Sequence, residues 1–125
     1  MNYRGTIIEE SLGDKSVLKN VKILSTKVET VTSEHNTPWV TQWTVHSVEI
    51  PEKKADEIAT ELSWSFDASH PQWYADFRND KVHYIIYNGQ QFKVAIGDEE
   101  GYKDVRDYGR SIGIPDDQLD FSLET

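Results

Sequence analysis

Alternating apolar and polar positions predict strands in the first half of the chain. Residues 3–10 and 21–32 contain runs of Ile, Val and Thr in loose alternation, with a polar turn between them. Residues 39–50 are predicted to form a longer strand. Each face of this strand mixes apolar and polar residues, so we expect it to be covered on both sides or to carry a site.

A helix is predicted to start after Ile50 and to end between residues 63 and 66. Pro51 lies in its first turn, and acidic residues follow, as the positive end of the helix dipole favours. Four apolar residues recur at i, i+3, i+4 and i+7, which is the spacing of one helical face: Ala55, Ile58, Ala59 and Leu62. We expect this face to be buried.

A β-hairpin is predicted over residues 82–96. Asn88-Gly89 joins two β-prone runs, and this dipeptide favours the positive φ angles of a two-residue type I′ turn. The turn fixes which residues face each other: Tyr87 and Gln90, Ile85 and Phe92, His83 and Val94. The face that carries these last two pairs is mostly apolar, so we expect it to be buried.

The last part of the chain is predicted to begin with a second helix. Asp98-Glu99-Glu100 is a helix-capping signal, and Gly113-Ile114-Pro115 ends the helix. The expected inner face consists of Tyr102, Val105, Tyr108 and Ile112. Residues 118–123 alternate and are either a final strand or a loosely docked tail.

These elements predict an α+β fold with a mainly antiparallel sheet and two helices on one face. From Trp39 onward the order is β-α-β-β-α-β, as in ferredoxin-like folds, and two extra N-terminal strands precede it. The alternative is a sheet of five or six strands in another order, in which the C-terminal segment is not a strand. At 125 residues, without a linker or an internal repeat, residues 1–125 are predicted to form a single domain.

The chain is acidic, and its charge is unevenly distributed. The net charge is −9, and residues 98–125 contain nine acidic but only three basic residues. Such a chain repels phosphate backbones, so we expect no nucleic-acid partner. The acidic end is suited to mimicking nucleic acid or meeting a basic protein, or it simply keeps a small protein soluble.

Composition also excludes several kinds of site and location. The chain has no cysteine, which rules out disulfides, thiolate nucleophiles and cysteine-ligated metals. Its apolar runs are shorter than the roughly 18–20 residues that cross a bilayer, and its N-terminus lacks the apolar region of a secretory signal. We therefore expect a cytoplasmic protein without a membrane partner. The dispersed glycines form no nucleotide-binding motif, and no cofactor is predicted.

Several short stretches resemble a family of small uncharacterised prokaryotic proteins of about this length: Thr37-Pro38-Trp39, Gln42-Trp43-Thr44, Glu49-Ile50-Pro51, Trp73-Tyr74-Ala75-Asp76-Phe77, His83-Tyr84-Ile85-Ile86, Tyr108-Gly109 and Ile112-Gly113-Ile114-Pro115. The resemblance covers nearly the whole chain. It implies a prokaryotic, cytoplasmic origin, and it brings no activity, cofactor or site residue with it.

Histidine and aspartate residues are the candidates for catalysis. His46 and His83 lie on predicted strands that could converge, and Asp76 could join them as an acid–base or metal-binding set. The histidines lack the spacings that are typical of metal sites, so no metal site is predicted. The structural alternatives are a core role for His83 and turn roles for Asp67 and Asp80.

Aromatic residues are the candidates for ligand binding. Trp and Tyr combine an apolar body with a hydrogen-bonding tip, which suits flat ligands, sugars or a partner protein. We expect most of the tryptophans to be core, with an aromatic-lined surface near the 38–39 loop and residues 70–80. The candidate ligand-binding residues are Trp39, Trp73, Tyr74, Asp76 and Arg78.

Three functional classes fit this pattern. The favoured interpretation is a small cytoplasmic interaction or small-ligand-binding domain without catalysis. The alternative is a small hydrolase-like or metal-dependent enzyme that uses His46, His83 and Asp76. The third is an acidic partner-mimic protein. The chain is expected to be a monomer or a homodimer paired through an edge strand.

Overall fold

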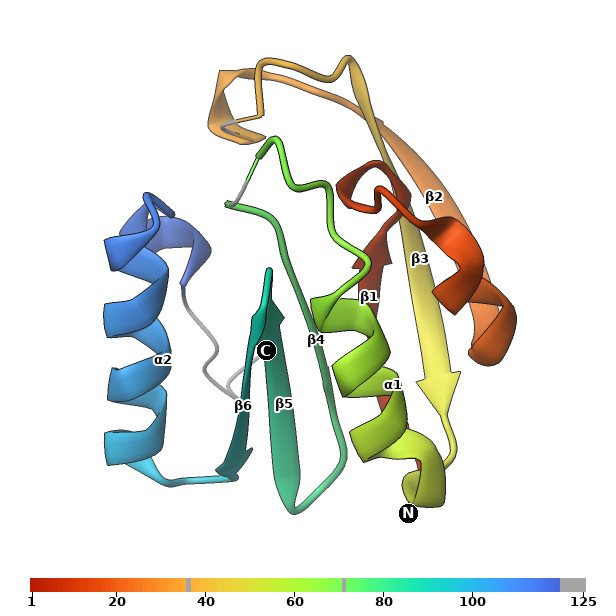
Figure 1. The fold of residues 1–125 in the computed structure, drawn as a ribbon, viewed down its shortest axis with the longest axis vertical. Helices are drawn as coiled ribbons and strands as arrows, with labels where there is room; N and C mark the ends of the chain where they lie inside the picture. Colours follow the sequence, from red (N-terminus) through yellow and green to blue (C-terminus); the bar gives the residue numbers. More distant parts are fainter. Residues whose placement is uncertain (36, 71, 120–125) are drawn as a thin grey trace.

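The computed structural model describes residues 1–35, 37–70 and 72–119, among which six strands form one sheet (Figure 1). The strand order is β2-β3-β1-β4-β5-β6, and every neighbouring pair is antiparallel. The main elements are β1 (Tyr3–Ile8), β2 (Lys22–Thr30), β3 (Gln42–Ile50), α1 (Ala55–Ser63), β4 (Tyr74–Arg78), β5 (Val82–Tyr87), β6 (Gln90–Ala95) and α2 (Glu99–Ser111). Short 3₁₀ helices lie in the connections: η1 (Glu9–Ser11), η2 (Lys15–Asn20), η3 (Ser33–His35), η4 (Glu52–Lys54) and η5 (Asp116–Gln118). The predicted α+β class and antiparallel sheet are confirmed.

The hairpin and both helices form where the sequence predicts them. Gly89 has a φ of 75°, and the hairpin has the predicted register, with Tyr87 opposite Gln90. The predicted apolar stripe of α1 is buried along its length. At the start of α2, the Asp98 carboxylate accepts a hydrogen bond from the Gly101 amide. Local signals therefore determine these three elements.

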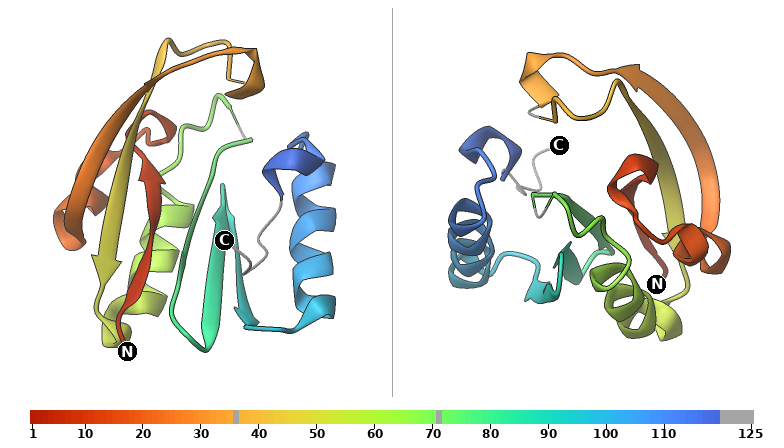
Figure 2. Two further views of the ribbon diagram at one scale, coloured as in Figure 1. Left: turned by 180° about the vertical axis from the view of Figure 1, so that it is seen from behind. Right: turned by 45° about the horizontal axis from the view of Figure 1, so that its top comes forward.

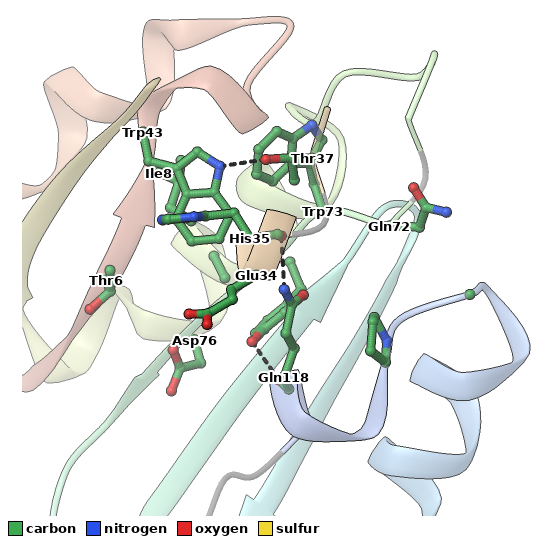
Figure 3. A pocket seen from close by; sticks show the side chains of 14 residues that line it. Thr6, Ile8, Glu34, His35, Thr37, Trp43, Gln72, Trp73, Asp76 and Gln118 are labelled. Atoms are coloured by element: carbon green, nitrogen blue, oxygen red, sulfur yellow. Dashed lines mark hydrogen bonds between the residues drawn. The ribbon is translucent and has the colours of Figure 1, made fainter. Parts of the chain in front are cut away.

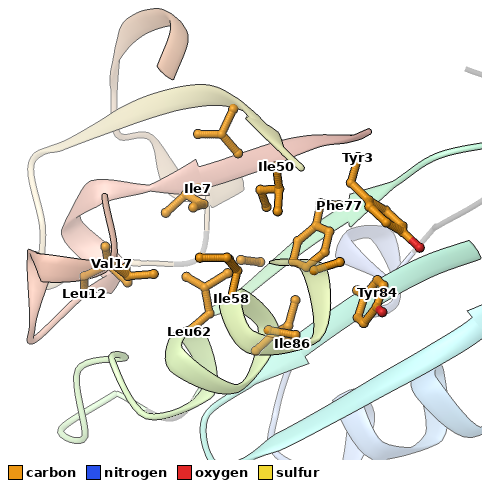
Figure 4. Packing of buried hydrophobic residues seen from close by; sticks show 14 of the residues in the cluster. Tyr3, Ile7, Leu12, Val17, Ile50, Ile58, Leu62, Phe77, Tyr84 and Ile86 are labelled. Atoms are coloured by element: carbon orange, nitrogen blue, oxygen red, sulfur yellow. The ribbon is translucent and has the colours of Figure 1, made fainter. Parts of the chain in front are cut away.

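The sheet divides the buried apolar side chains into two clusters. Tyr84 and Ile86 of β5 belong to the larger cluster, which also contains the apolar stripe of α1 (Figure 4). Ile85 and Tyr87 of β5 pack instead with Tyr102 and its neighbours on α2. Successive residues of a strand point to opposite faces, so α1 and α2 cover opposite faces of the sheet. The prediction that both helices share one face is therefore wrong. With one helix on each face of the sheet, β5 is buried on both of its sides.

The ferredoxin-like order predicted from Trp39 onward is not found among the described strands. That order requires the strand before α1 to run parallel to a later strand, but β3 pairs antiparallel with β1 and β2. Residues 74–78 form the additional strand β4, which lies between β1 and β5. Of the predicted final strand over 118–123, Gln118 belongs to η5, and residues 120–123 lie outside the described residues.

β2 lies at one edge of the sheet and is its least covered strand. Figure 2 shows it at the outer edge of the curved sheet, on the side away from α2. The apolar side chains of Ile23, Leu24 and Val28 are exposed there. Pairing of two copies through an edge strand stays a prediction, for which β2 is the candidate strand.

Candidate functional site

A pocket of about 590 Å³ opens on the face of the sheet that α1 does not cover (Figure 3). Thr6 and Ile8 of β1, Trp43 of β3 and Asp76 of β4 contribute side chains from this face. The remaining walls come from three segments: Glu34, His35 and Thr37; residues 72–75; and Gly113, Pro115 and Gln118. Small-molecule sites typically have volumes of roughly 300–1,000 Å³, so this pocket is the candidate functional site.

Gly5 sets the floor of the pocket by allowing β1 and β4 to approach each other closely. A Cβ atom at Gly5 would lie 2.0 Å from the carbonyl oxygen of Asp76 and 2.6 Å from the Cα of Phe77. Those are backbone atoms, so a larger residue would push the two strands apart. The close pairing places Thr6 opposite Asp76 on the pocket face.

One wall is formed by the η3 loop, which is fixed against β3. The indole nitrogen of Trp43 donates a hydrogen bond to the Thr37 hydroxyl at 2.9 Å. The His35 ring meets the Trp43 ring edge-on, with 4.4 Å between centroids. Nδ1 of His35 accepts a hydrogen bond from the Thr32 amide at 3.0 Å, which leaves Nε2 to donate toward Glu29. The loop and the strand therefore hold Trp43 in a defined orientation.

The opposite wall is formed by the turn that contains η5. The Gln118 side-chain amide donates a hydrogen bond to the carbonyl oxygen of His35 at 2.8 Å. The Tyr74 hydroxyl donates to the backbone carbonyl of Gln118 at 2.5 Å. Figure 3 shows both hydrogen bonds meeting at Gln118, beside the opening between the η3 loop and β4. Gln118 therefore joins the two sides of the pocket.

Asp76 connects the pocket to a buried hydrogen-bond chain. Its side chain is 32% exposed, and one carboxylate oxygen lies 2.7 Å from Nε2 of His83. His83 is 1% exposed, and its Nδ1 lies 2.9 Å from the Tyr102 hydroxyl. Burial raises the pKa of Tyr102, an effect that Arg78 opposes and Asp76 adds to, so the hydroxyl keeps its proton. Because a carboxylate only accepts, Nε2 of His83 donates to Asp76, while Nδ1 is engaged by the Tyr102 hydroxyl.

The structure distributes the predicted ligand-binding residues over three places. Trp73, Tyr74 and Asp76 line the pocket, although Trp73 is only 3% exposed. Trp39 lies in a turn before β3 and stacks on His70, with 4.1 Å between the ring centroids and 7° between the planes. It meets Trp73 edge-on, so it supports the pocket from behind.

Arg78, the fifth predicted ligand-binding residue, lines a different hollow. Its partner across the β1–β4 pairing is Arg4, and both side chains lie at the end of the sheet near the N-terminus. Arg78 was predicted to lie beside the aromatic residues because it is close to them in the sequence. Along β4, however, Arg78 lies beyond Asp76, at the end of the strand that is away from the pocket.

The candidate catalytic residues do not converge at one place. Asp76 and His83 are hydrogen bonded, but His46 points to the other face of the sheet. There its ring lies 2.9 Å from Glu9 and 2.8 Å from Thr26. Within the described part of the chain, no three His, Asp or Glu side chains are grouped as metal ligands would be.

Sequence reasoning missed several residues of the pocket. Glu34 and His35 belong to a loop that composition marks only as polar, and Gln118 was predicted to lie in a strand or a tail. Trp43 was recognised as one of several aromatic residues but not selected for the site. These residues meet only through contacts between distant segments, and no local pattern signals such contacts.

Comparison with known proteins found no relative: no family model, curated protein or solved structure matches this chain. The resemblance to a family of small prokaryotic proteins therefore stays a prediction. No helix in the described ranges has both the length and the apolar character needed to span a membrane.

Proposed function

We propose that this protein binds a small organic molecule in the pocket and does not catalyse a reaction on it. The observation that carries the proposal is an aromatic-lined pocket of about 590 Å³. Pockets of this size, with apolar walls and a few polar groups, are the usual sites of small ligands.

The aromatic side chains of the pocket support binding because they are fixed in place. Trp43 is held by its hydrogen bond to Thr37, and Tyr74 is held by its hydrogen bond to Gln118. Trp73 packs behind them in the core. A ligand that contacts these rings does not have to order them first, which reduces the entropic cost of binding.

The enzyme alternative has less support. His83 is buried, and both of its ring nitrogens are within hydrogen-bond distance of Asp76 or Tyr102. It therefore cannot reach a substrate without rearrangement, as a general base must. His46 lies on the other face of the sheet, which leaves Asp76 as the one candidate catalytic residue that lines the pocket.

The partner-mimic alternative also has less support. A mimic of nucleic acid needs a continuous acidic face. On and after α2, Asp107 instead pairs with Lys103 and Arg110, and Asp116 pairs with Arg110. These local ion pairs are typical of an ordinary solvated surface.

We also propose that the chain acts as a single cytoplasmic domain, without nucleic acid or a membrane as a partner. The net charge of −9 supports the exclusion of nucleic acid. The exposed edge of β2 supports the homodimer more than the monomer, because uncapped edge strands tend to pair.

A fragment screen against the wild-type protein tests the binding proposal. Thermal unfolding and two-dimensional amide NMR spectra would be recorded with a library of small aromatic compounds. We expect hits that raise the unfolding temperature, because a ligand of the native state stabilises it. Their amide chemical shift changes should centre on Glu34, His35 and Thr37, on residues 72–76, and on Gly113 and Gln118.

A blocking variant and a matched control make the screen specific for the pocket. Thr6→Phe puts a larger, strand-favouring side chain on the pocket floor without removing any packing. Trp64→Phe is the control, because Trp64 is 75% exposed and lies outside the pocket. Hits should be lost in the Thr6 variant and kept in the Trp64 variant. The proposal is wrong if no compound binds or if both variants bind equally.

A further inference from the structure

We infer that the ligand of this pocket is a small organic cation, an amine or ammonium compound with an aromatic or apolar body. The inference rests on the proposed binding function and adds the chemical class of the ligand. In the bound state, the positive group lies beside the carboxylates of Asp76 and Glu34, and the body of the ligand contacts the aromatic wall.

The charges around the pocket have a single sign. Asp76 and Glu34 line it, and none of the described lining residues is a lysine or an arginine. The one imidazole, that of His35, accepts at Nδ1 from the Thr32 amide and is directed at Nε2 toward Glu29. Figure 3 shows the Glu34 and Asp76 side chains pointing toward the same part of the pocket. Carboxylates near each other are stabilised when a positive group lies between them.

Several donors of the walls are already engaged within the protein: Trp43 with Thr37, Tyr74 with Gln118, and the Gln118 amide with His35. The indole N–H of Trp73, buried at the pocket, has no hydrogen-bond partner among the described residues. The carboxylates of Asp76 and Glu34 are acceptors only. An ammonium group meets them with up to three donors and a positive charge.

The aromatic wall favours the same class of ligand. The ring faces of Trp and Tyr carry negative potential and attract cations, and Trp does so best. Trp43 on β3 and Tyr74 on β4 line the same pocket as the carboxylates of Glu34 and Asp76. The acidic charge of the whole chain, −9, also raises the local concentration of cations over that of anions.

Matched compounds test the inference directly. Each set contains three aromatic molecules that differ only in an ethylammonium, hydroxyethyl or acetate group: tryptamine, indole-3-ethanol and indole-3-acetate, with the phenyl and naphthyl equivalents. Dissociation constants would be measured by NMR titration and calorimetry. We expect the amines to bind at least about tenfold more tightly than the alcohols, and the carboxylates to bind most weakly.

Charge-neutralising variants locate the effect. Asp76→Asn keeps an oxygen that can accept from His83, so it removes the charge and preserves the buried contact. Glu34→Gln changes an exposed side chain of the η3 loop. Either variant should weaken amine binding about tenfold and leave alcohol binding nearly unchanged. Asp80→Asn, which changes an exposed acid outside the pocket, is the matched control and should have no effect.

The outcomes separate this inference from the binding proposal on which it rests. If alcohols bind as tightly as amines, or if pocket hits of the fragment screen are neutral or anionic, the cation inference is wrong and the binding proposal stands. Equal loss of amine and alcohol binding in the Asp76 variant also overturns the inference. If no compound binds in either experiment, both are wrong.

Discussion

At the residue scale, the Asp76 carboxylate takes part in two separate contacts, and the sequence pattern does not distinguish them. Its carboxylate lines the pocket, and the same group accepts a hydrogen bond from the buried ring of His83. The ring in turn contacts the Tyr102 hydroxyl of α2. A change at Asp76 therefore alters the lining of the pocket and the contact that links β4 and β5 to α2.

Removing the Asp76 side chain is expected to destabilise the protein. In Asp76→Ala, Nε2 of His83 loses its acceptor while the ring stays buried, which should cost about 1–3 kcal/mol of unfolding free energy. Asp76→Asn should lose much less, because the amide oxygen still accepts. Urea unfolding measures both, and Asp80→Ala should stay within about 0.5 kcal/mol of wild type. Equal stability of Asp76→Ala and wild type would contradict the buried chain.

Glu10 should contribute stability that depends on pH. Its carboxylate accepts hydrogen bonds from the amide and the hydroxyl of Thr44. Burial by itself would raise the pKa of Glu10, but the hydrogen bonds outweigh it and hold the pKa below the ordinary value of 4.5. The stabilisation is therefore complete above about pH 4.5 and is lost as the pH falls through the lowered pKa of the folded state.

The variant Glu10→Gln tests this pH dependence. It should be less stable than wild type by about 1 kcal/mol at pH 7, because a charge-assisted hydrogen bond becomes a neutral one. Urea unfolding between pH 7 and about pH 3 should show the difference shrinking toward the acid end. A difference that is constant over this range would mean that the charge of Glu10 has no part in it.

At the element scale, the pairing of β1 with β4 is the contact that builds the pocket floor. β1 has no room for a side chain at Gly5, whereas its neighbours Thr6 and Ile8 reach the pocket. The pairing joins residues far apart in the sequence and fixes which side chains of β4 face the pocket. Because the backbones of β1 and β4 approach so closely at Gly5, β1 needs a glycine at this position.

Gly5→Ala is expected to be strongly destabilising. The new methyl group would overlap the backbone of β4, so the strands must separate at a cost of at least about 3 kcal/mol, or the protein fails to fold. Gly13→Ala is the control, because a Cβ there would meet its nearest atom at 3.5 Å. Thermal unfolding should show a large decrease for the first variant and little change for the second. Similar melting temperatures would disprove the close approach.

The sequence predicts the elements whose signals are local, and it fails where distant segments meet. Asn88-Gly89 and the spacing of Ile58 and Leu62 determine the hairpin and α1 within a few residues. The strand order, and the face of the sheet that each helix covers, depend on packing between segments that are distant in the sequence. For the site, alternation predicts that either Trp73 or Tyr74 is exposed, but nothing local places Gln118 against His35.

At the scale of the whole molecule, the curved sheet separates two kinds of surface. One face packs on α1 and forms the larger core cluster, whereas the other is covered by α2 over β5 and β6 and opens into the pocket over β1, β3 and β4. The pocket lies between the η3 loop and the turn that contains η5, as Figure 3 shows. Segments from the first and the last parts of the chain border it.

The charge of the whole chain predicts how amine binding responds to salt. Attraction between a cation and a protein of net charge −9 is screened by ions. Raising NaCl from about 20 to about 300 mM should weaken tryptamine binding several-fold and slow its association. Indole-3-ethanol should bind equally at both concentrations. Salt-independent tryptamine binding would show that the charge of the chain has no part in recognition.

Successive side chains of the strands point to opposite faces of the sheet, and this has a consequence for how the protein can evolve. Tyr84 and Ile86 maintain the packing on α1, whereas the pocket draws its side chains from the opposite face of the sheet. Thr6 and Asp76 lie on the pocket face and outside the α1 core cluster, so substitutions there leave that cluster untouched, whereas Trp43 also packs against it. Under the proposed function, the ligand of the pocket can change through alternate positions of β1 and β4 while the packing on α1 is kept.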